Sequence, residues 1–549
     1  MTQRRTLNAN TLLLFGRIAT LITVPVSANA INVTNLLDSG AGSLRDAITQ
    51  AESSAGADQI NFQISGTVNF SSVLPTITSD ISINSNGFGV TFDGASAGGR
   101  GFFVESGGSL SLSNFTVQNF FEGSSSGGAI RTQSGNLNIF GSSFIDNTGF
   151  TGGAFFSSGG SVLIQDSTFS GNRGLQGGAI SASGTTIDIV NSQLTGNTAI
   201  APTGAPGGAG IGGALSFSSG SNATIRNSNI DNNVGEVAGG GIRINNSTTT
   251  VDIENSTINQ NEAQGVSEDG GGLTISGGAQ VIITNSEVNE NTSEGNGGAI
   301  QIQNSGSSVT VERTTISGNS AEAGGGIRSD EGNVTVIEST ISGNEATDGE
   351  GGGINATRGD QLTVENSTVS GNEASGGGGG IVVSTGASAT VESSTIAFNN
   401  SGAGGAGIRF STDSGSTFTA SNTIFSENRN SGVLNSIGGS VDSSGFNLFD
   451  DDGGSIVGST LTDQLNGSPD LQALADNGGA TFTHALGASS DAIDSGSSNQ
   501  ATDQRGFLRP AGSQSDIGAF EFGAVPEPSN TVLLMSLLSL IALFRRKRR

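Results

Sequence analysis

One repeated pattern constrains this chain more than any other feature. An apolar residue stands three positions before an asparagine, and successive asparagines are about 25 to 30 residues apart. The pairs are Phe144/Asn147, Phe169/Asn172, Leu194/Asn197, Ile230/Asn233, Ile258/Asn261, Val288/Asn291, Ile316/Asn319, Ile341/Asn344, Val369/Asn372, Ile396/Asn399 and Phe425/Asn428. The longer gap between Asn197 and Asn233 contains residues 201–212, which we expect to form a loop inserted in one coil. A period of this length is typical of solenoids, in which each repeat forms one coil.

Each repeat contains two other short patterns. Glycines precede one apolar residue in the first, as in Gly298-Ala299-Ile300, and the second alternates, as in Val334-Thr335-Val336. Three short strands per repeat are therefore predicted, and period-two alternation turns their apolar residues to one inward face. In one repeat these residues are Ile327, Val334, Val336 and Ile341.

Three short strands cannot bury an apolar face alone, but stacked coils about 4.8 Å apart can. We therefore predict an all-β fold, a single-stranded parallel β-helix of the pectate-lyase type. It would have roughly 13 coils and a length of about 60–65 Å. The usual hand of parallel crossovers makes it right-handed. Glycine and asparagine suit the sharp turns, and stacked asparagines can hydrogen-bond along the axis, so their expected role is structural.

Sequence patterns divide the chain into five parts: 1–30 signal peptide, 31–58 N-terminal cap, 59–447 β-helix repeats, 448–523 C-terminal capping module and 524–549 sorting signal. In the N-terminal cap we expect an amphipathic helix from Ser43 to Ala51. Ser43 is its N-cap, with Asp46 three residues on. Its apolar face consists of Leu44, Ala47, Ile48 and Ala51.

Both ends carry targeting patterns. At the start, Arg4 and Arg5 precede a short apolar run, residues 18–26, and Ala28 and Ala30 fit a signal cleavage site. At the other end, Pro526-Glu527-Pro528 precedes an apolar run, residues 532–544, and five basic residues. That run predicts a C-terminal hydrophobic helix of roughly 20 Å, short for a bilayer core of about 30 Å.

Composition excludes some classes of function. The net charge is -27, the chain has no Cys, Trp or Tyr, and its only Lys is Lys547. Nucleic-acid binding needs clustered basic residues, so no nucleic acid is an expected partner. The absent cysteines exclude a disulfide framework.

Four motifs resemble known families. The order Pro526-Glu527-Pro528, apolar helix and basic tail resembles the PEP-CTERM sorting signal, which implies an exosortase-type enzyme and the membrane as partners. Gly128-Ala129-Ile130 and Phe144-Ile145-Asp146-Asn147 resemble the GGAI and FxxN repeats of chlamydial polymorphic outer membrane proteins, which implies surface adhesion. Residues 38–48 resemble the CSLREA motif of secreted β-helix proteins, with Gly42 in place of its Cys. Residues 440–521 resemble the choice-of-anchor module, which implies a capping role.

No catalytic, cofactor-binding or metal-binding constellation stands out. Calcium is a weaker alternative at Asp450-Asp451-Asp452-Gly453 and Glu268-Asp269-Gly270, although solvated turn acids explain both. His484, the only histidine, is expected to stabilise the fold. An outward row of threonines also raises ice binding as a hypothesis; its members are Thr168, Thr257, Thr315, Thr340, Thr368 and Thr395.

The combined patterns predict an exported, adhesin-like structural protein without catalysis, at the cell surface, in the outer membrane or in the extracellular matrix. A transient stay in the inner membrane is one alternative. Its binding partner would be a surface polysaccharide or a ligand on a host or neighbouring cell. The alternative function is a polysaccharide-active enzyme, a lyase or glycoside hydrolase, on the same scaffold.

Overall fold

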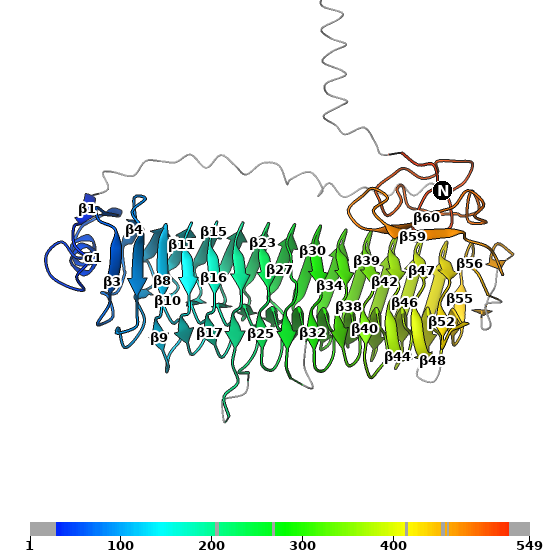
Figure 1. Ribbon diagram of the computed structural model, residues 1–549, viewed down its shortest axis with the longest axis horizontal. Helices are drawn as coiled ribbons and strands as arrows, with labels where there is room; N and C mark the ends of the chain where they lie inside the picture. The colour runs from blue at the N-terminus through cyan, green and yellow to red at the C-terminus, as the bar shows by residue number, and fades with distance from the viewer. Residues whose placement is uncertain are drawn as a thin grey trace, which may run out of the picture.

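The chain winds into a long rod of stacked coils, and a typical central coil has strands on four faces (Figure 1). The computed structural model describes residues 29–203, 208–265, 270–411, 415–451, 456–457 and 461–525. One coil consists of β37 (Ile327–Asp330), β38 (Asn333–Ile337), β39 (Thr340–Ser342) and β40 (Glu345–Ala346). Each pairs in parallel with its counterpart in the next coil. We expected three strands; the fourth, β40, is too short for an alternating pattern to reveal it.

The four faces are named sheets A to D. Sheet A has 17 strands and contains β1 (Asn29–Val33) and β57 (Ile456–Val457). Sheets C and D have 13 strands each, running from β6 (Phe102–Val104) to β54 (Ile437–Gly438) and from β9 (Phe121–Glu122) to β53 (Val433–Leu434). Sheet B has a run of seven strands, β3 (Gly66–Asn69) to β24 (Asn229–Asp231), and a run of eight. The eight are β31 (Glu287–Asn289), β35 (Thr315–Ser317), β39, β43 (Thr368–Ser370), β47 (Thr395–Ala397), β51 (Ile424–Ser426), β56 (Leu448–Phe449) and β58 (Gln464–Leu465).

The predicted parallel β-helix is confirmed. Sheet A has 17 strands, which is more than the roughly 13 coils expected from the sequence. The motifs mark only the central coils, whereas β2 (Asp58–Phe62) and β4 (Asp80–Asn84) build earlier coils without the asparagine. Strand β1, which lies in the segment predicted as the N-terminal cap, pairs in parallel with β2.

The core lies inside the coils and follows the predicted alternation. Ile327, Val334, Val336 and Ile341 are at most 1% exposed. Ile327 lies directly below Ile354 in sheet C, and Ile341 lies between Ile316 and Val369 in sheet B. Aligning identical positions in this way gives every coil an apolar layer on both sides, so the stack buries a face that one coil cannot.

The asparagines form a buried hydrogen-bonded ladder, which confirms their structural role. From Asn147 to Asn428, each Nδ2 donates to the Oδ1 of the next coil's asparagine at 2.8–3.0 Å. The same Nδ2 also donates to a carbonyl of the preceding coil, as from Asn344 to Ile316 at 3.0 Å. A second buried ladder was not predicted; in it a side-chain hydroxyl accepts from a main-chain nitrogen of the preceding coil, as Ser367 Oγ accepts from the Ser339 nitrogen at 3.1 Å.

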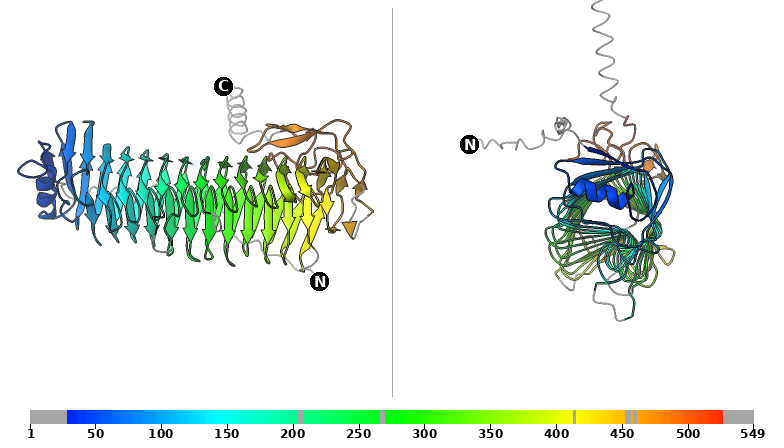
Figure 2. Two further views of the ribbon diagram at one scale, coloured as in Figure 1. Left: turned by 60° about the horizontal axis from the view of Figure 1, so that its bottom comes forward. Right: turned by 90° about the vertical axis from the view of Figure 1, so that its left-hand side faces the viewer.

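The N-terminal helix covers the first coil (Figure 2). Helix α1 (Leu44–Glu52) begins after Ser43, whose Oγ accepts a hydrogen bond from the main-chain nitrogen of Asp46 at 3.2 Å. Its predicted apolar face is buried in the same core as the coils. The helix therefore shields the open end of the apolar interior from water.

The C-terminal segment folds back along the side of the rod (Figure 1). Strands β59 (Leu471–Ala475) and β60 (Thr483–Leu486) form an antiparallel hairpin within it. Within the predicted capping module, residues 448–523, strands β56, β57 and β58 continue the coil stack. From residue 466 onward, the chain lies against the outer surface of sheet B, where it finds polar partners. No helix of the described residues is long and apolar enough to span a membrane.

Candidate functional site at the junction of coils and module

The junction between residues 466–525, hereafter the module, and sheet B contains several buried hydrogen bonds between residues more than 100 positions apart. The Gln504 side chain donates to Thr340 Oγ1 at 2.9 Å and accepts from Thr368 Oγ1 at 2.6 Å. The main-chain nitrogen of Ala519 donates to Thr395 Oγ1 at 3.1 Å. These three threonines align outward as predicted, but the module buries them. They therefore offer no exposed threonine face of the kind that ice binding requires.

His484 joins the module to the coils through both ring nitrogens. Ser370 Oγ and the ring Nε2 are 2.7 Å apart, and Nδ1 lies 2.7 Å from the carbonyl oxygen of Gln472. Since a carbonyl can only accept, the neutral ring carries its proton on Nδ1 and Ser370 donates to Nε2. Burial lowers the pKa of His484 and favours this neutral form. The contacts support the expected fold-stabilising role.

The module has a small apolar core beside a buried ionic cluster. Leu486, Ile517 and Phe520 pack on Ile424 and Leu448 of the coils. Next to them, both Nε and Nη2 of Arg505 donate to Asp503, at 2.9 and 2.6 Å.

Arg509 is the second cation of the ionic cluster. Its Nη2 donates to the carbonyl oxygen of Gly518 at 2.7 Å, and its Nε lies 3.7 Å from Glu521. Burial raises the pKa values of Asp516 and Glu521, and the positive charge of Arg509 counteracts this rise. The module is thus held together by charge pairs where the coils use aliphatic layers.

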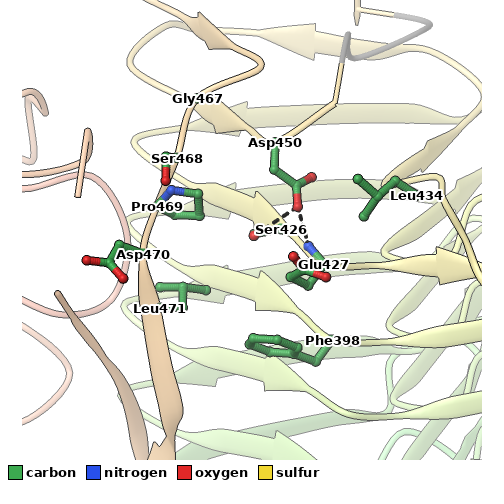
Figure 3. A pocket seen from close by; sticks show the side chains of 10 residues that line it. All are labelled: Phe398, Ser426, Glu427, Leu434, Asp450, Gly467, Ser468, Pro469, Asp470 and Leu471. Carbon is green, nitrogen blue, oxygen red and sulfur yellow. Dashed lines mark hydrogen bonds between the residues drawn. The ribbon is translucent and has the colours of Figure 1, made fainter. Parts of the chain in front are cut away.

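A cavity of about 390 Å³ opens between the module and the last coils (Figure 3). Its lining comes from the coils (Phe398, Ser426, Glu427, Leu434 and Asp450) and from the module (Gly467, Ser468, Pro469, Asp470 and Leu471). Asp470 directs its carboxylate away from the gap and accepts from Ser489 Oγ at 2.7 Å. Asp450 Oδ2 accepts from Ser426 Oγ and from the main-chain nitrogen of Glu427. Burial raises the pKa of Asp450.

The calcium alternative gains no support from this geometry. Asp450 uses its carboxylate for the contacts above, and Asp451 Oδ2 accepts from the main-chain nitrogen of Ser436 at 3.0 Å. Across the residues that the structure describes, no group of three or more His, Cys, Asp and Glu side chains is arranged to hold a metal ion. Residues 452–453 and 268–269 lie outside the described residues.

Most arginines of the body are committed to ion pairs. Ten of the thirteen lie within 4.0 Å of a carboxylate oxygen: Arg45, Arg100, Arg226, Arg313, Arg328, Arg358, Arg409, Arg429, Arg505 and Arg509. Proton abstraction by an arginine requires the neutral guanidine, and a neighbouring carboxylate stabilises the charged form. The ion pairs thus disfavour a role as the base of a lyase, although burial lowers the pKa of Arg100 and of Arg509.

The targeting residues are almost all outside the described residues. Ala28, Pro526, Glu527 and Pro528 belong to this group, so the cleavage site and the sorting signal stay predictions. Ala30 is exposed in β1 and lies opposite Gln59 of β2. The polar series in the module was noticed in the sequence, but its partners in the coils, 136 residues away for Gln504 and Thr368, carry no pairing signal.

The family model described as "Right handed beta helix region" matches residues 69–295 and 271–448. No curated protein matches the chain. Three of the similar solved structures are the following. The first is the Vag8-C1 inhibitor complex (11% identity, 80% of this chain, 99% of that chain, TM-score 0.42). The second is the A-module of the mannuronan C-5 epimerase AlgE6 of Azotobacter vinelandii (11% identity, 74% of this chain, 94% of that chain, TM-score 0.33). The third is pectate lyase Pel9A (15% identity, 90% of this chain, 97% of that chain, TM-score 0.26).

These structural likenesses are too low to carry an argument about function. The family match is different, because it covers most of the chain and coincides with the coils described above. The chain belongs to the right-handed beta helix family.

Proposed function

We propose that this chain is an exported structural protein of the cell surface or extracellular matrix, displayed through its C-terminal tail and without catalysis. One observation carries the proposal. The module is fastened to four successive coils by buried hydrogen bonds, and in the sequence it is followed directly by Pro526. A tail that holds the membrane or is processed there would thus be joined firmly to the whole rod.

The exosortase-type processing step can be tested with matched variants of a tagged full-length chain. We expect replacement of Pro526 and Pro528 by alanine to remove the protein from its normal envelope or matrix fraction. Ser529→Ala, one residue beyond the motif, is the control and should leave the location unchanged. An unchanged location for the double variant, or for a chain lacking residues 526–549, would refute display through the tail.

The alternative, a polysaccharide-active enzyme, makes a different prediction. Carboxylates are abundant on the rod, so chance pairs exist, and glycoside hydrolysis needs two of them roughly 5 to 9.5 Å apart. Incubation of the purified protein with acidic and neutral polysaccharides should give no new reducing ends and no unsaturated products. Turnover of any of them would replace the structural proposal with the enzymatic one.

A further inference from the structure

One turn of the coil recurs with the same backbone but very different side chains. The residue before each ladder asparagine has a positive φ, between 53° and 65°. Its occupants from the second to the last marked coil are Gly171, Gly196, Asn232, Gln260, Glu290, Gly318, Gly343, Gly371, Phe398 and Glu427. Glycine adopts this conformation without strain, whereas a bulky residue rarely adopts it.

Phe398 is the one aromatic residue among these turns. Its φ is 58°, and its side chain is 40% exposed. In the coil before it, a Cβ built on Gly371 would meet open space, so the fold does not require a large side chain at this corner. A strained residue that the backbone does not need indicates a use for its side chain.

The ring of Phe398 has two neighbours. One side packs on His484 of the module, with ring centroids 5.0 Å apart. The ring also lines the cavity at the junction, together with Glu427, which occupies the same turn one coil later (Figure 3). Two adjacent turns thus direct an aromatic face and a carboxylate toward the same space.

The lining of the cavity combines aliphatic surface with carboxylates. Leu434, Pro469 and Leu471 supply aliphatic surface, and Glu427 and Asp450 supply carboxylates. Glu427 already accepts from Arg429 at the surface, which shows that a guanidinium can reach it. Such half-exposed pairs are worth about 0–1 kcal/mol, so a ligand can displace or join Arg429.

We propose that this cavity binds the side chain of a basic residue, an aliphatic stem ending in a guanidinium or ammonium group, presented by a protein partner. The stem lies along Leu434, Pro469 and Leu471, and the cation lies over the Phe398 ring beside Glu427. An anionic ligand would face two carboxylates, and a purely apolar ligand would desolvate them without compensation. The net charge of -27 also draws cations to the surface.

Ligand-observed NMR with the full chain tests this proposal independently of export. The probes are Nα-acetyl-arginine methylamide and Nα-acetyl-lysine methylamide, and the norleucine analogue is the neutral control. We expect saturable, millimolar binding of at least one basic probe and binding of the norleucine analogue about tenfold weaker or absent. Equal binding of the neutral analogue, no binding of either basic probe, or preferential binding of methyl glucoside would overturn the proposal.

Variants of the lining residues test whether the basic probes bind in the cavity. Glu427→Gln keeps the size of the side chain and is expected to weaken binding of the basic probe at least tenfold. Glu290→Gln alters the same turn far from the cavity and should leave binding unchanged. Phe398→Gly should also weaken binding at least tenfold while it removes the strained φ. Protease protection of the module reports whether Phe398→Gly releases the module from the coils. If it does, the affinity of Glu427→Gln for the basic probe decides between binding and no binding at this cavity. An unchanged affinity of Glu427→Gln refutes the proposed site.

Discussion

Thr315 and Thr368 occupy the same outward position of sheet B, two coils apart, but their surroundings differ completely. Thr315 is partly exposed, whereas Thr368 is fully buried and donates to Gln504. Their local sequences are nearly the same, Thr315-Ile316-Ser317-Gly318-Asn319 and Thr368-Val369-Ser370-Gly371-Asn372. The repeat therefore determines what faces the interior, while a segment more than 100 residues away determines what happens outside.

The interiors of the two regions differ as well. The coils bury aliphatic layers and neutral amide ladders, so every position is supported by the same position above and below. The module buries Asp503, Arg509, Glu521 and the side chain of Arg505 beside a small apolar core. A charge cluster depends on each partner, because the loss of one leaves the others buried and unpaired.

The largest expected effect is on the ladder in the coils. Asn319→Ala removes the acceptor of the Asn291 main-chain nitrogen and side-chain amide, and the donor to the Val288 carbonyl and to Asn344 Oδ1. Four buried groups lose a partner, so we expect a loss of about 3–6 kcal/mol in the free energy of unfolding. Denaturant unfolding measures it, with Asn333→Ala on the exposed face of β38 as the control. If both variants behave alike, the ladder does not stabilise the rod.

The next effect tests the charge cluster of the module. Arg509→Met leaves Glu521 and Asp516 buried without their cation, and we expect a loss of about 3–5 kcal/mol confined to the module. Residues 466–525 should become protease-sensitive at a temperature where the coils remain folded. Arg358→Met, which removes an exposed partner of Asp330, should change little. Simultaneous loss of coils and module would show that the two regions unfold as one unit.

A smaller effect concerns a buried carboxyl in the coils. Burial raises the pKa of Asp360 to about 6, from its ordinary value of 3.8. Between these values the folded chain binds more protons than the unfolded chain, so stability falls as the pH rises and about 3 kcal/mol is lost above pH 6. Asp360→Asn keeps an acceptor for the Thr357 nitrogen, so the variant should be more stable at pH 7 and equal near pH 4.

The matched control for this variant is Asp252→Asn, on the exposed face of β27 (Thr250–Glu254), which should leave the pH dependence as it is. Unfolding midpoints in denaturant from pH 4 to pH 8 give the comparison. A wild-type midpoint that does not decline as the pH rises from 4 to 7 would contradict a raised pKa at Asp360.

The repeating coils could be predicted from the sequence, whereas the contacts of the module could not. Residues such as Ile327 and Ile341 were placed correctly because the pattern repeats in every coil and each copy has the same neighbours. The early strands β2 and β4 lie at the start of the predicted repeats, residues 59–447, but they lack the asparagine that identifies individual coils in the sequence. The helix α1 was predicted because its N-cap and its apolar face are both local signals.

The contacts of the candidate site could not be predicted from the sequence, and the reason is physical. Gln504 and Thr368 are each ordinary polar residues, and nothing in a single sequence indicates that they are partners. The same holds for Phe398, whose neighbours His484 and Leu471 come from the module. Contacts between a repeat and a non-repeating segment have no period, so only the folded chain reveals them.

The smallest effect tests the opening comparison directly. Thr368→Val removes the hydroxyl that donates to Gln504 and leaves a buried amide oxygen without that donor, whereas Thr315→Val changes a partly exposed position of the same strand type. We expect Thr368→Val to weaken docking of the module by about 1–2 kcal/mol and Thr315→Val to stay within about 0.5 kcal/mol. Hydrogen exchange in residues 466–525 measures the difference, because local opening of the module exposes its amides. Equal protection in the two variants would mean that apolar packing on Ile424 and Leu448, and not the threonine row, holds the module on the rod.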